Sequence, residues 1–502
     1  MEDIILNPLT YPVLSWTIFL PLIGAAVILF LRREALIRWT ALATTLATLV
    51  VSLPLYTQFD KTTPRMQFVE IRHWIPSWDV VYKVGVDGIS IPFVFLAAVL
   101  SVLCVAVSWK AIQAKVREFF IALLITETAM IGIFASLNFY LFYVFWELML
   151  IPMFLLIGVW GGPNRIYAAI KFVLFTLSGS VLMLVGIIAL YSSGGGTLDF
   201  LALMNVRLPL ETQAWLFAAF LAAFAVKVPM FPVHTWLPDA HTEAPTAGSV
   251  ILAGILLKMG AYGFLRISLP MLRDATMLFL EPMLVLSVGA ILYGAYVTLT
   301  QNDMKRLIAY SSVSHMGFVT LGIFTLTRNG LEGGILQMVN HGVLTGALFL
   351  CVGIIYERTH TRMIKDYGGL FKVVPVFTTF LALFCLAATG FPGLNGFVGE
   401  FLIVSGAFKT RILFGVLAVW GVVLGVTYMA WLYYRVALNG VAEGLREHLT
   451  DLDAREVATL VPLVALALLI GLYPDSFLGY MHVSVQHPLE QVTSATLNAG
   501  AF

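Results

Sequence analysis

The sequence predicts an all-α polytopic membrane protein with about fourteen transmembrane helices. Of its 502 residues, 60% are hydrophobic and only 11% are charged, whereas a soluble domain has about 25% charged residues. The apolar residues stand in runs of about 20, the length that crosses a bilayer as a helix. These runs lack the alternation of apolar and polar residues that β-barrel strands require. The composition therefore excludes a disordered chain, a nucleic-acid-binding protein and an ordinary soluble enzyme.

Each apolar run predicts one spanning helix, in the order of the chain. Glu2 and Asp3 precede the first run in place of basic residues, so we expect that run to insert as a helix without being a cleavable signal. The run 374–408 is too long for one straight helix. The predicted ranges are 12–31, 36–56, 88–109, 119–136, 139–159, 165–191, 213–231, 245–266, 276–298, 307–325, 334–355, 374–408, 412–434 and 456–480.

The distribution of Lys and Arg predicts the orientation. The loops fall alternately into two sets, one for each side of the membrane. The set that starts with the loop after the first helix carries the larger share of these cations. Lys305 and Arg362 are counted in this set, and Arg266 in the other. By the positive-inside rule the richer set is cytoplasmic and both termini face outward. The net charge of +1 implies no acidic or basic partner. The three cysteines, Cys104, Cys351 and Cys385, lie singly in apolar runs and predict no metal site.

Six ionisable residues lie within the predicted spans. An Asp, Lys or Arg at mid-membrane costs about 2.5–3.5 kcal/mol on insertion scales. Six such groups would cost about 18 kcal/mol, more than the typical net stability of about 5–15 kcal/mol. They are therefore expected to face one another, backbone dipoles or water. The six are Glu127, Glu147, Lys171, Lys227, Lys258 and Glu400.

Glu147 and Lys227 are the candidates for charge coupling. Glu147 interrupts the run FYLFYVFWELMLIPMFLLIGVW near its centre, where a structural ion pair is the alternative to a titrating site. Lys227 ends an apolar stretch and is followed by Pro229 and Pro232, so the helix is predicted to break after the lysine. A broken helix within a membrane lines a cavity and exposes dipole ends that bind ions. Lysine suits such a site because desolvation lowers its pKa and a nearby carboxylate raises it, so its charge can change when its partner moves.

A second break is predicted in ATGFPGLNGFVGEFLI. Gly390, Pro392, Gly393 and Gly396 interrupt the long run there, and Glu400 follows. The alternative is a loop between two short helices. Two broken helices, each with an ionisable residue beside the break, are typical of an inverted-repeat transporter core.

Four histidines are candidates for a proton relay, because histidine titrates nearest physiological pH. His234 and His241 follow the first break, and Lys258 lies in the next predicted helix. His315 and His341 lie in separate later spans. With Ser311, Ser312, Ser314, Asn340 and Thr345 they would form a polar thread through apolar helices, although a lone buried histidine is more often a satisfied core residue. Glu127 and Lys171, near span ends, are second candidates for either relay or structural pairing.

The segments KVPMFPVHTWLPDAHTEAPTAGSVILAGILLKMGAYG, NDMKRLIAYSSVSHMG and GFPGLNGFVGEFLI carry a resemblance to a known family. They resemble the antiporter-like subunit M (chain 4) family of respiratory complex I, NADH:quinone oxidoreductase. The resemblance runs from about residue 85 to 440 and implies fourteen helices, two inverted five-helix repeats and broken helices 7 and 12. The implied divisions are helices 1–3 in 1–118, the first repeat in 119–270, the second in 271–440, and helix 14 with a tail in 441–502.

The resemblance also implies roles for the buried charges. Glu147 and Lys227 would be the coupling pair, Lys258 the lysine of the central axis, and Glu400 the distal site. His234, His241, His315 and His341 would hydrate and connect the axis. Glutamate at 400 favours this family over the related subunits L and N and the large Mrp-type antiporter chain, which are similar but typically carry lysine there.

The resemblance implies a proton-translocating subunit without redox chemistry of its own. NADH, FMN, iron–sulfur clusters and quinone would belong to partner subunits, and subunits L and N would lie on either side in the inner membrane of a bacterium. No nucleic-acid partner is expected. Three alternatives stay open: a subunit of an Mrp-type cation/proton antiporter, a subunit of a membrane-bound hydrogenase or formate-oxidising complex, and a passive scaffold with inert buried charges.

Overall fold

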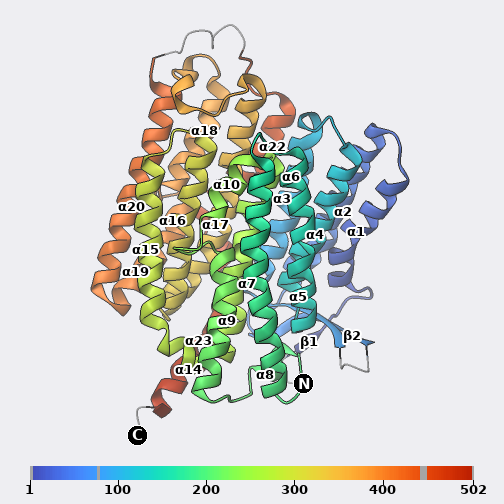
Figure 1. Cartoon of the computed structure of the whole chain (residues 1–502), viewed down its shortest axis with the longest axis vertical. Helices are drawn as coiled ribbons and strands as arrows, with labels where there is room; N and C mark the ends of the chain where they lie inside the picture. Colours follow the sequence, from blue (N-terminus) through green and yellow to red (C-terminus); the bar gives the residue numbers. More distant parts are fainter. Residues whose placement is uncertain (1–3, 76–79, 441–448, 500–502) are drawn as a thin grey trace.

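The chain forms a bundle of long, roughly parallel helices (Figure 1), seen in a computed structural model that describes residues 4–75, 80–440 and 449–499. Within these ranges, 13 helices are long and apolar enough to cross a membrane. The predicted all-α fold class is confirmed. Both ends of the chain lie at the same end of the bundle (Figure 1).

The N-terminal part contains four spanning helices and one small sheet. The sheet pairs β1 in parallel with β2 and β2 antiparallel with β3, and the sequence analysis did not predict it. It lies at the end of the bundle that holds the termini (Figure 1). The elements are β1 Ile4–Leu6, α1 Val13–Phe30, α2 Glu34–Thr57, β2 Met66–Ile75, β3 Val80–Val86, α3 Ile91–Ala111 and α4 Val116–Ala135.

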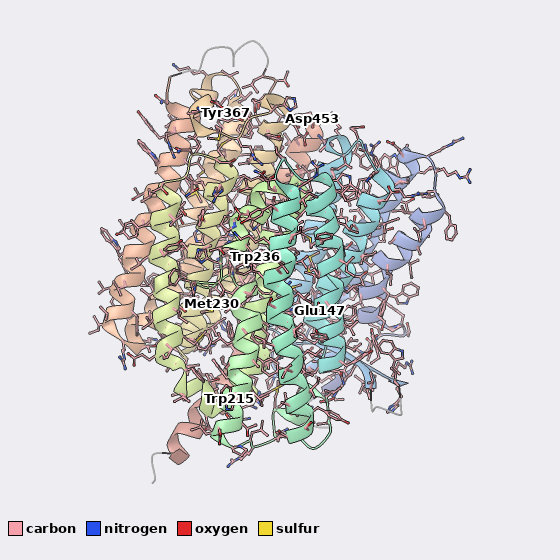
Figure 2. The ribbon with its side chains drawn as sticks, viewed as in Figure 1. Glu147, Trp215, Met230, Trp236, Tyr367 and Asp453 are labelled. Carbon is pink, nitrogen blue, oxygen red and sulfur yellow. The ribbon has the colours of Figure 1, made fainter. Side chains whose placement is uncertain are left out.

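The next group contains the first predicted break. Helix α9 ends at Lys227, as the two following prolines predict, and α10 begins at Trp236 after an irregular segment. Met230, within this segment, lies near mid-height of the bundle (Figure 2). The elements are α5 Phe139–Leu148, α6 Leu150–Trp160, α7 Arg165–Ser193, α8 Phe200–Leu203, α9 Leu210–Lys227 and α10 Trp236–Glu243.

One long helix, from Thr246 to Met271, alternates between α-helical and π-helical turns. The π-helical segments are of interest because such turns are rare in proteins, and those that occur are often found at functional sites. In order, the helix consists of α11 Thr246–Ile251, η2 Leu252–Leu256, α12 Leu257–Gly263, η3 Phe264–Ser268 and α13 Leu269–Met271.

The second predicted break is also present. The run 374–408 divides into α18 and α19, and Gly390 and Gly393 between them have φ of +71° and +91°, values that side chains other than glycine rarely adopt. The elements are α14 Arg273–Leu278, α15 Leu280–Leu299, α16 Met304–Phe324, α17 Arg328–Thr359, η4 Ile364–Asp366, η5 Leu370–Lys372, α18 Pro375–Ala388, α19 Asn395–Thr410, α20 Ile412–Tyr433 and η6 Tyr434–Leu438.

The C-terminal part contains two helices where one was predicted. Helix α22, Ala454–Leu472, is the last spanning candidate of the described residues, and α23, Asp475–Ala499, follows it directly. The predicted helix 456–480 therefore ends early. Residues 441–448 and 500–502 of the predicted C-terminal division lie outside the described residues.

The core of the bundle is made by the helix Thr246–Met271 and by α17. Their most apolar stretches are entirely buried in the chain, which fits helices that are apolar on all sides. Lys258 and His341 lie on these two helices and are both buried. Their polar atoms can therefore find hydrogen-bond partners only among neighbouring groups inside the bundle. This placement decides the geometry of the candidate site.

Candidate functional site

Lys258 is at the centre of the site. Its side chain is 0% exposed, and it lies on α12 directly after the π-helical segment Leu252–Leu256. The ammonium donates a hydrogen bond to the backbone carbonyl of Ala253 in that segment. Its Nζ atom also lies 2.6 Å from Nδ1 of His341 on α17. A basic amine and an imidazole are therefore in direct hydrogen-bonding contact inside the apolar core.

His315 and Glu400 continue this contact on two further helices. The ring centroids of His341 and His315, on α16, are 5.9 Å apart. Nδ1 of His315 lies 3.2 Å from Oε1 of Glu400 on α19, although the angle is not that of a hydrogen bond. Tyr428 also lies beside His315, with 3.4 Å between its hydroxyl and Nε2. Four residues predicted separately from the sequence are thus brought together.

The gap between the two histidines contains a small cavity. It measures about 10 Å³ as space for the centre of a water molecule and is lined by both histidines, Gln337, Thr345 and Glu400, among others. A volume of roughly 10–15 Å³ on this scale holds one water. Nε2 of His341 is buried and has no hydrogen-bond partner among the described residues. One water here would connect the two imidazoles.

Glu400 is held by the second break and by α17. Oε1 accepts a hydrogen bond of 3.1 Å from Nε2 of Gln337. A Cβ atom at Gly390 would lie 3.0 Å from Oε2 of Glu400, so the absence of a side chain at Gly390 allows the carboxyl group to approach the broken segment. The predicted proximity of Glu400 to its break is confirmed.

The two histidines after the first break have different surroundings. His241 on α10 is 0% exposed and stacks on Phe349 at 4.7 Å. Lys258 and Lys305 are both close enough to repel a positive charge on its ring. His234 packs against Tyr293, with ring centroids 5.0 Å apart. Neither histidine has a hydrogen-bond partner in the described part of the chain.

Glu147 and Lys227 are neighbours without a direct ion pair. Nζ of Lys227 lies 5.3 Å from the ring centroid of Trp146 and 5.8 Å from that of Phe172. Glu147, on α5 (Figure 2), is near enough to attract the ammonium electrostatically. Among the described residues no ion pair joins the two side chains, and Oε1 of Glu147 is buried without a hydrogen bond.

The two second candidates differ from each other. Lys171 on α7 forms an ion pair of 2.7 Å with Asp239 on α10, which Arg306 also approaches at 3.7 Å. Glu127 lies near the middle of α4, Val116–Ala135, so its predicted place near a span end is wrong. Its side chain is 0% exposed, and neither carboxyl oxygen has a hydrogen-bond partner within residues 4–75, 80–440 and 449–499. Lys171 is therefore part of a charge cluster, whereas Glu127 is isolated in the apolar core.

Two cations that the sequence analysis assigned to loops are buried, which corrects that assignment. Lys305 is 6% exposed at the start of α16, and its ammonium donates to the carbonyl of Ala244. Arg266 is 5% exposed and forms an ion pair of 2.6 Å with Asp87. The signal for Lys305 was present: Asp303 caps α16 by accepting from the backbone N–H of Lys305 at 2.7 Å. An Asp just before an apolar run predicts a helix start, which places Lys305 inside the helix.

The site contains no cluster that fits a metal ion. Among the described residues, no group of three or more His, Cys, Asp or Glu side chains could hold one. The three cysteines are buried singly. The groups at the centre of the bundle that can exchange protons are the amine of Lys258, the imidazoles of His341 and His315 and the carboxyl of Glu400.

Comparison with known proteins shows which family the chain resembles. A family model described as "NADH:quinone oxidoreductase/Mrp antiporter, TM" matches residues 136–425. The chain is 48% identical to NADH-quinone oxidoreductase subunit M of Rhodobacter capsulatus, over 94% of this chain and 96% of that protein. It is 45% identical to NADH-ubiquinone oxidoreductase chain 4 of Marchantia polymorpha, over 95% and 97% of the two chains.

Solved structures show the same fold. A chain of respiratory complex I from Thermus thermophilus with bound NADH matches with a TM-score of 0.88 and 31% identity, covering 95% of this chain and 99% of that one. A chain of the Mrp complex from Dietzia sp. DQ12-45-1b has a TM-score of 0.81 at 19% identity, covering 97% of this chain and 56% of that one. The second likeness concerns the fold alone.

Proposed function

The chain belongs to the family of NADH:quinone oxidoreductase subunit M, or chain 4, and on this premise we propose how its buried charges move protons. It is a proton-translocating membrane subunit of the respiratory complex I. Electron transfer from NADH to quinone, elsewhere in the complex, provides the driving force.

The contact between Lys258 and His341 is the observation that carries the proposal. At 2.6 Å, the amine and the imidazole can exchange a proton without moving. His341, one water in the small cavity, His315 and Glu400 then form a connected series of titratable groups. We call this series, Lys258–His341–His315–Glu400, the proton axis.

Glu147 and Lys227 couple the axis to the neighbouring subunit. The Lys227 ammonium is stabilised by Glu147 and by the aromatic faces of Trp146 and Phe172. A charge that arrives beside Glu147 would weaken this stabilisation, and Lys227 would release its proton toward Lys258. Glu400 would then release a proton outward. Electrostatic changes of this kind are strong in a low-dielectric interior.

The redox chemistry belongs to partner subunits in this proposal. NADH, FMN, the iron–sulfur clusters and quinone would be bound there, and this chain would contribute no electron carrier. Subunits L and N would be its neighbours on either side. The chain would lie in the inner membrane of a bacterium with both termini on the outer face, the orientation that its loop cations favour.

Substitution of the coupling pair tests the proposal. Lys227→Ala and Glu147→Ala complexes, reconstituted in vesicles, are expected to assemble and to oxidise NADH with strongly reduced proton translocation. Lys409→Ala, at an exposed lysine outside the axis, is the matched control and is expected to translocate at the wild-type level. Either of the first two variants translocating at full stoichiometry would contradict the proposal.

A further inference from the structure

Two buried amide side chains lie between Glu400 and the second break. Gln337 and Asn340 are on α17, 2% and 0% exposed, close before His341. Nδ2 of Asn340 donates to Oε1 of Gln337 at 3.2 Å, and Nε2 of Gln337 donates to Oε1 of Glu400 at 3.1 Å. The three side chains therefore form one hydrogen-bonded series that ends at the carboxyl group.

The other end of this series is a backbone group. Nδ2 of Asn340 also donates to the backbone carbonyl of Asn395, the first residue of α19, at 2.8 Å. A backbone carbonyl can only accept a hydrogen bond, so the NH₂ end of the Asn340 amide must face it. A reversed amide would bring two oxygen atoms into contact. The orientation of Asn340 is therefore fixed by a group that cannot change its own role.

The orientation of Asn340 determines that of Gln337. Because Asn340 offers an NH₂ group, Gln337 meets it with Oε1, and its own NH₂ group faces Glu400. A glutamine amide without this neighbour could present either end to a carboxyl group, since one end donates and the other accepts. Gly399 provides the room for the contact, because a Cβ atom there would overlap both amides.

A donor beside Glu400 changes the behaviour of its carboxyl group. An N–H group that points at a carboxyl oxygen stabilises the ionised form, whereas an amide oxygen in its place stabilises the protonated form. The titratable groups that face Glu400 are His315 on α16 and His341 on α17, with Tyr428 on α20 beside His315. No charged residue of α18 or α22 lines the cavity next to it. The Gln337 amide is thus a donor that does not titrate, among groups that do.

We propose that Asn340 is a positioning residue, which holds the Gln337 amide with its NH₂ end toward Glu400 so that the carboxyl group releases its proton. The inference rests on the proposed function and adds the two side chains that set the proton affinity of the distal site. The same contact joins this site to the start of α19, since Nδ2 of Asn340 also binds the Asn395 carbonyl. Neither amide gains or loses a proton.

A purely structural role for Asn340 makes a different prediction. The residue links α17 to α19, and the loss of this link alone would lower the stability of the complex without changing the proton affinity of Glu400. Asn329 provides the matched control. It also lies on α17 and donates to α19, to Oγ of Ser405 at 3.1 Å, but it does not line the cavity beside Glu400.

The experiment measures protons translocated per NADH oxidised as a function of pH, in vesicles that contain the assembled complex and the same buffer on both sides. Asn340→Leu and Gln337→Met nearly keep the side-chain volumes but remove the amides. Without the donor Glu400 keeps its proton to higher pH, so we expect the acidic limit of translocation to move upward by about 1–2 pH units in Gln337→Met and in the same direction in Asn340→Leu. The double variant is expected to shift no further than Gln337→Met, because the two residues act through one contact. Asn329→Leu is expected to keep the wild-type profile.

Two results would overturn the inference. One is an Asn340→Leu complex that denatures at a lower temperature but keeps the wild-type pH profile, which would assign the residue a structural role. The other is an equal shift in Asn329→Leu, because any lost contact between α17 and α19 would then suffice. If Asn340→Leu does not assemble, Gln337→Met decides alone, by whether its profile shifts.

Glu400→Gln, measured in parallel, separates this inference from the proposed function. If that variant translocates at the wild-type level, the proton axis itself fails. If it is impaired while Gln337→Met keeps the wild-type profile, the axis remains and the positioning role is wrong.

Discussion

Gly399→Ala tests whether the packing of α17 against α19 sets the position of Glu400. A Cβ atom at Gly399 would lie 2.4 Å from Oε1 of Gln337 and 2.8 Å from Nδ2 of Asn340. Gln337 is the residue that donates to Glu400 at 3.1 Å. Forcing extra volume into a packed core costs about 1–3 kcal/mol, and losing a hydrogen bond to a charged group costs about 1.5–3 kcal/mol.

These terms give the expected magnitude. Replacing glycine by alanine within a helix returns about 1 kcal/mol, so the net destabilisation is about 1.5–5 kcal/mol. We expect the Gly399→Ala complex to denature at a lower temperature and to translocate fewer protons per NADH. Gly289→Ala, on α15, is the matched control, because a Cβ atom there meets nothing within 4 Å.

The double variant Gly399→Ala/Gln337→Ala sharpens the test. Removing the Gln337 amide makes room for the new methyl group but leaves Glu400 without this donor. Thermal stability is therefore expected to recover in part while proton translocation stays low. A Gly399→Ala complex with wild-type stability and wild-type translocation would refute the reasoning.

Two further predictions concern stability. Asp87→Ala leaves the buried Arg266 guanidinium without its carboxylate at 2.6 Å, so we expect a loss of about 3–5 kcal/mol, measured as a lower denaturation temperature; if the addition of Arg266→Met does not recover most of that loss, the unpaired charge is not its cause. Asp453 caps α22 in a capping box with Glu456, and Asp453→Ala is expected to cost about 0.5–2 kcal/mol. Burial raises the pKa of Asp453, but hydrogen bonds from the Glu456 N–H and from Lys110 outweigh it and hold the pKa below its ordinary value. A carboxyl with a lowered pKa stabilises the folded chain at neutral pH, and this contribution disappears as the pH falls from about 4. The wild-type complex is therefore expected to lose more stability on acidification than Asp453→Asn. Equal losses would contradict a stabilising role of the Asp453 carboxylate.

The breaks were predictable because their cause is local. Proline removes a backbone donor and glycine permits positive φ, so Pro229, Pro232, Gly390 and Gly393 mark the interruptions in the sequence itself. The span positions were predictable for the same reason, since each depends on one continuous apolar run. The predicted repeat relation between the two helix groups stays a prediction.

The rest depends on contacts between distant residues. The sheet pairs residues near Ile4 with residues near Met66, and nothing in either segment alone specifies the partner. Arg266 pairs with Asp87, far away in the sequence, so a loop position appeared as reasonable as a core position. The sequence predicted which groups would be buried among the axis residues. It did not predict that Lys258 contacts His341, or that the rings of Trp146 and Phe172 lie beside Lys227, which the resemblance had only paired with Glu147 for coupling.

Proton translocation by the Lys258→Met complex tests the central claim most directly. Methionine keeps the apolar stem of the side chain but cannot exchange a proton with His341. Lys365→Met, at an exposed lysine, is the control for the loss of a charge. In vesicles containing the intact complex, we expect the number of protons moved per NADH oxidised to fall for Lys258→Met and to stay at the wild-type value for Lys365→Met. An unchanged ratio in the Lys258→Met complex would contradict the proton axis.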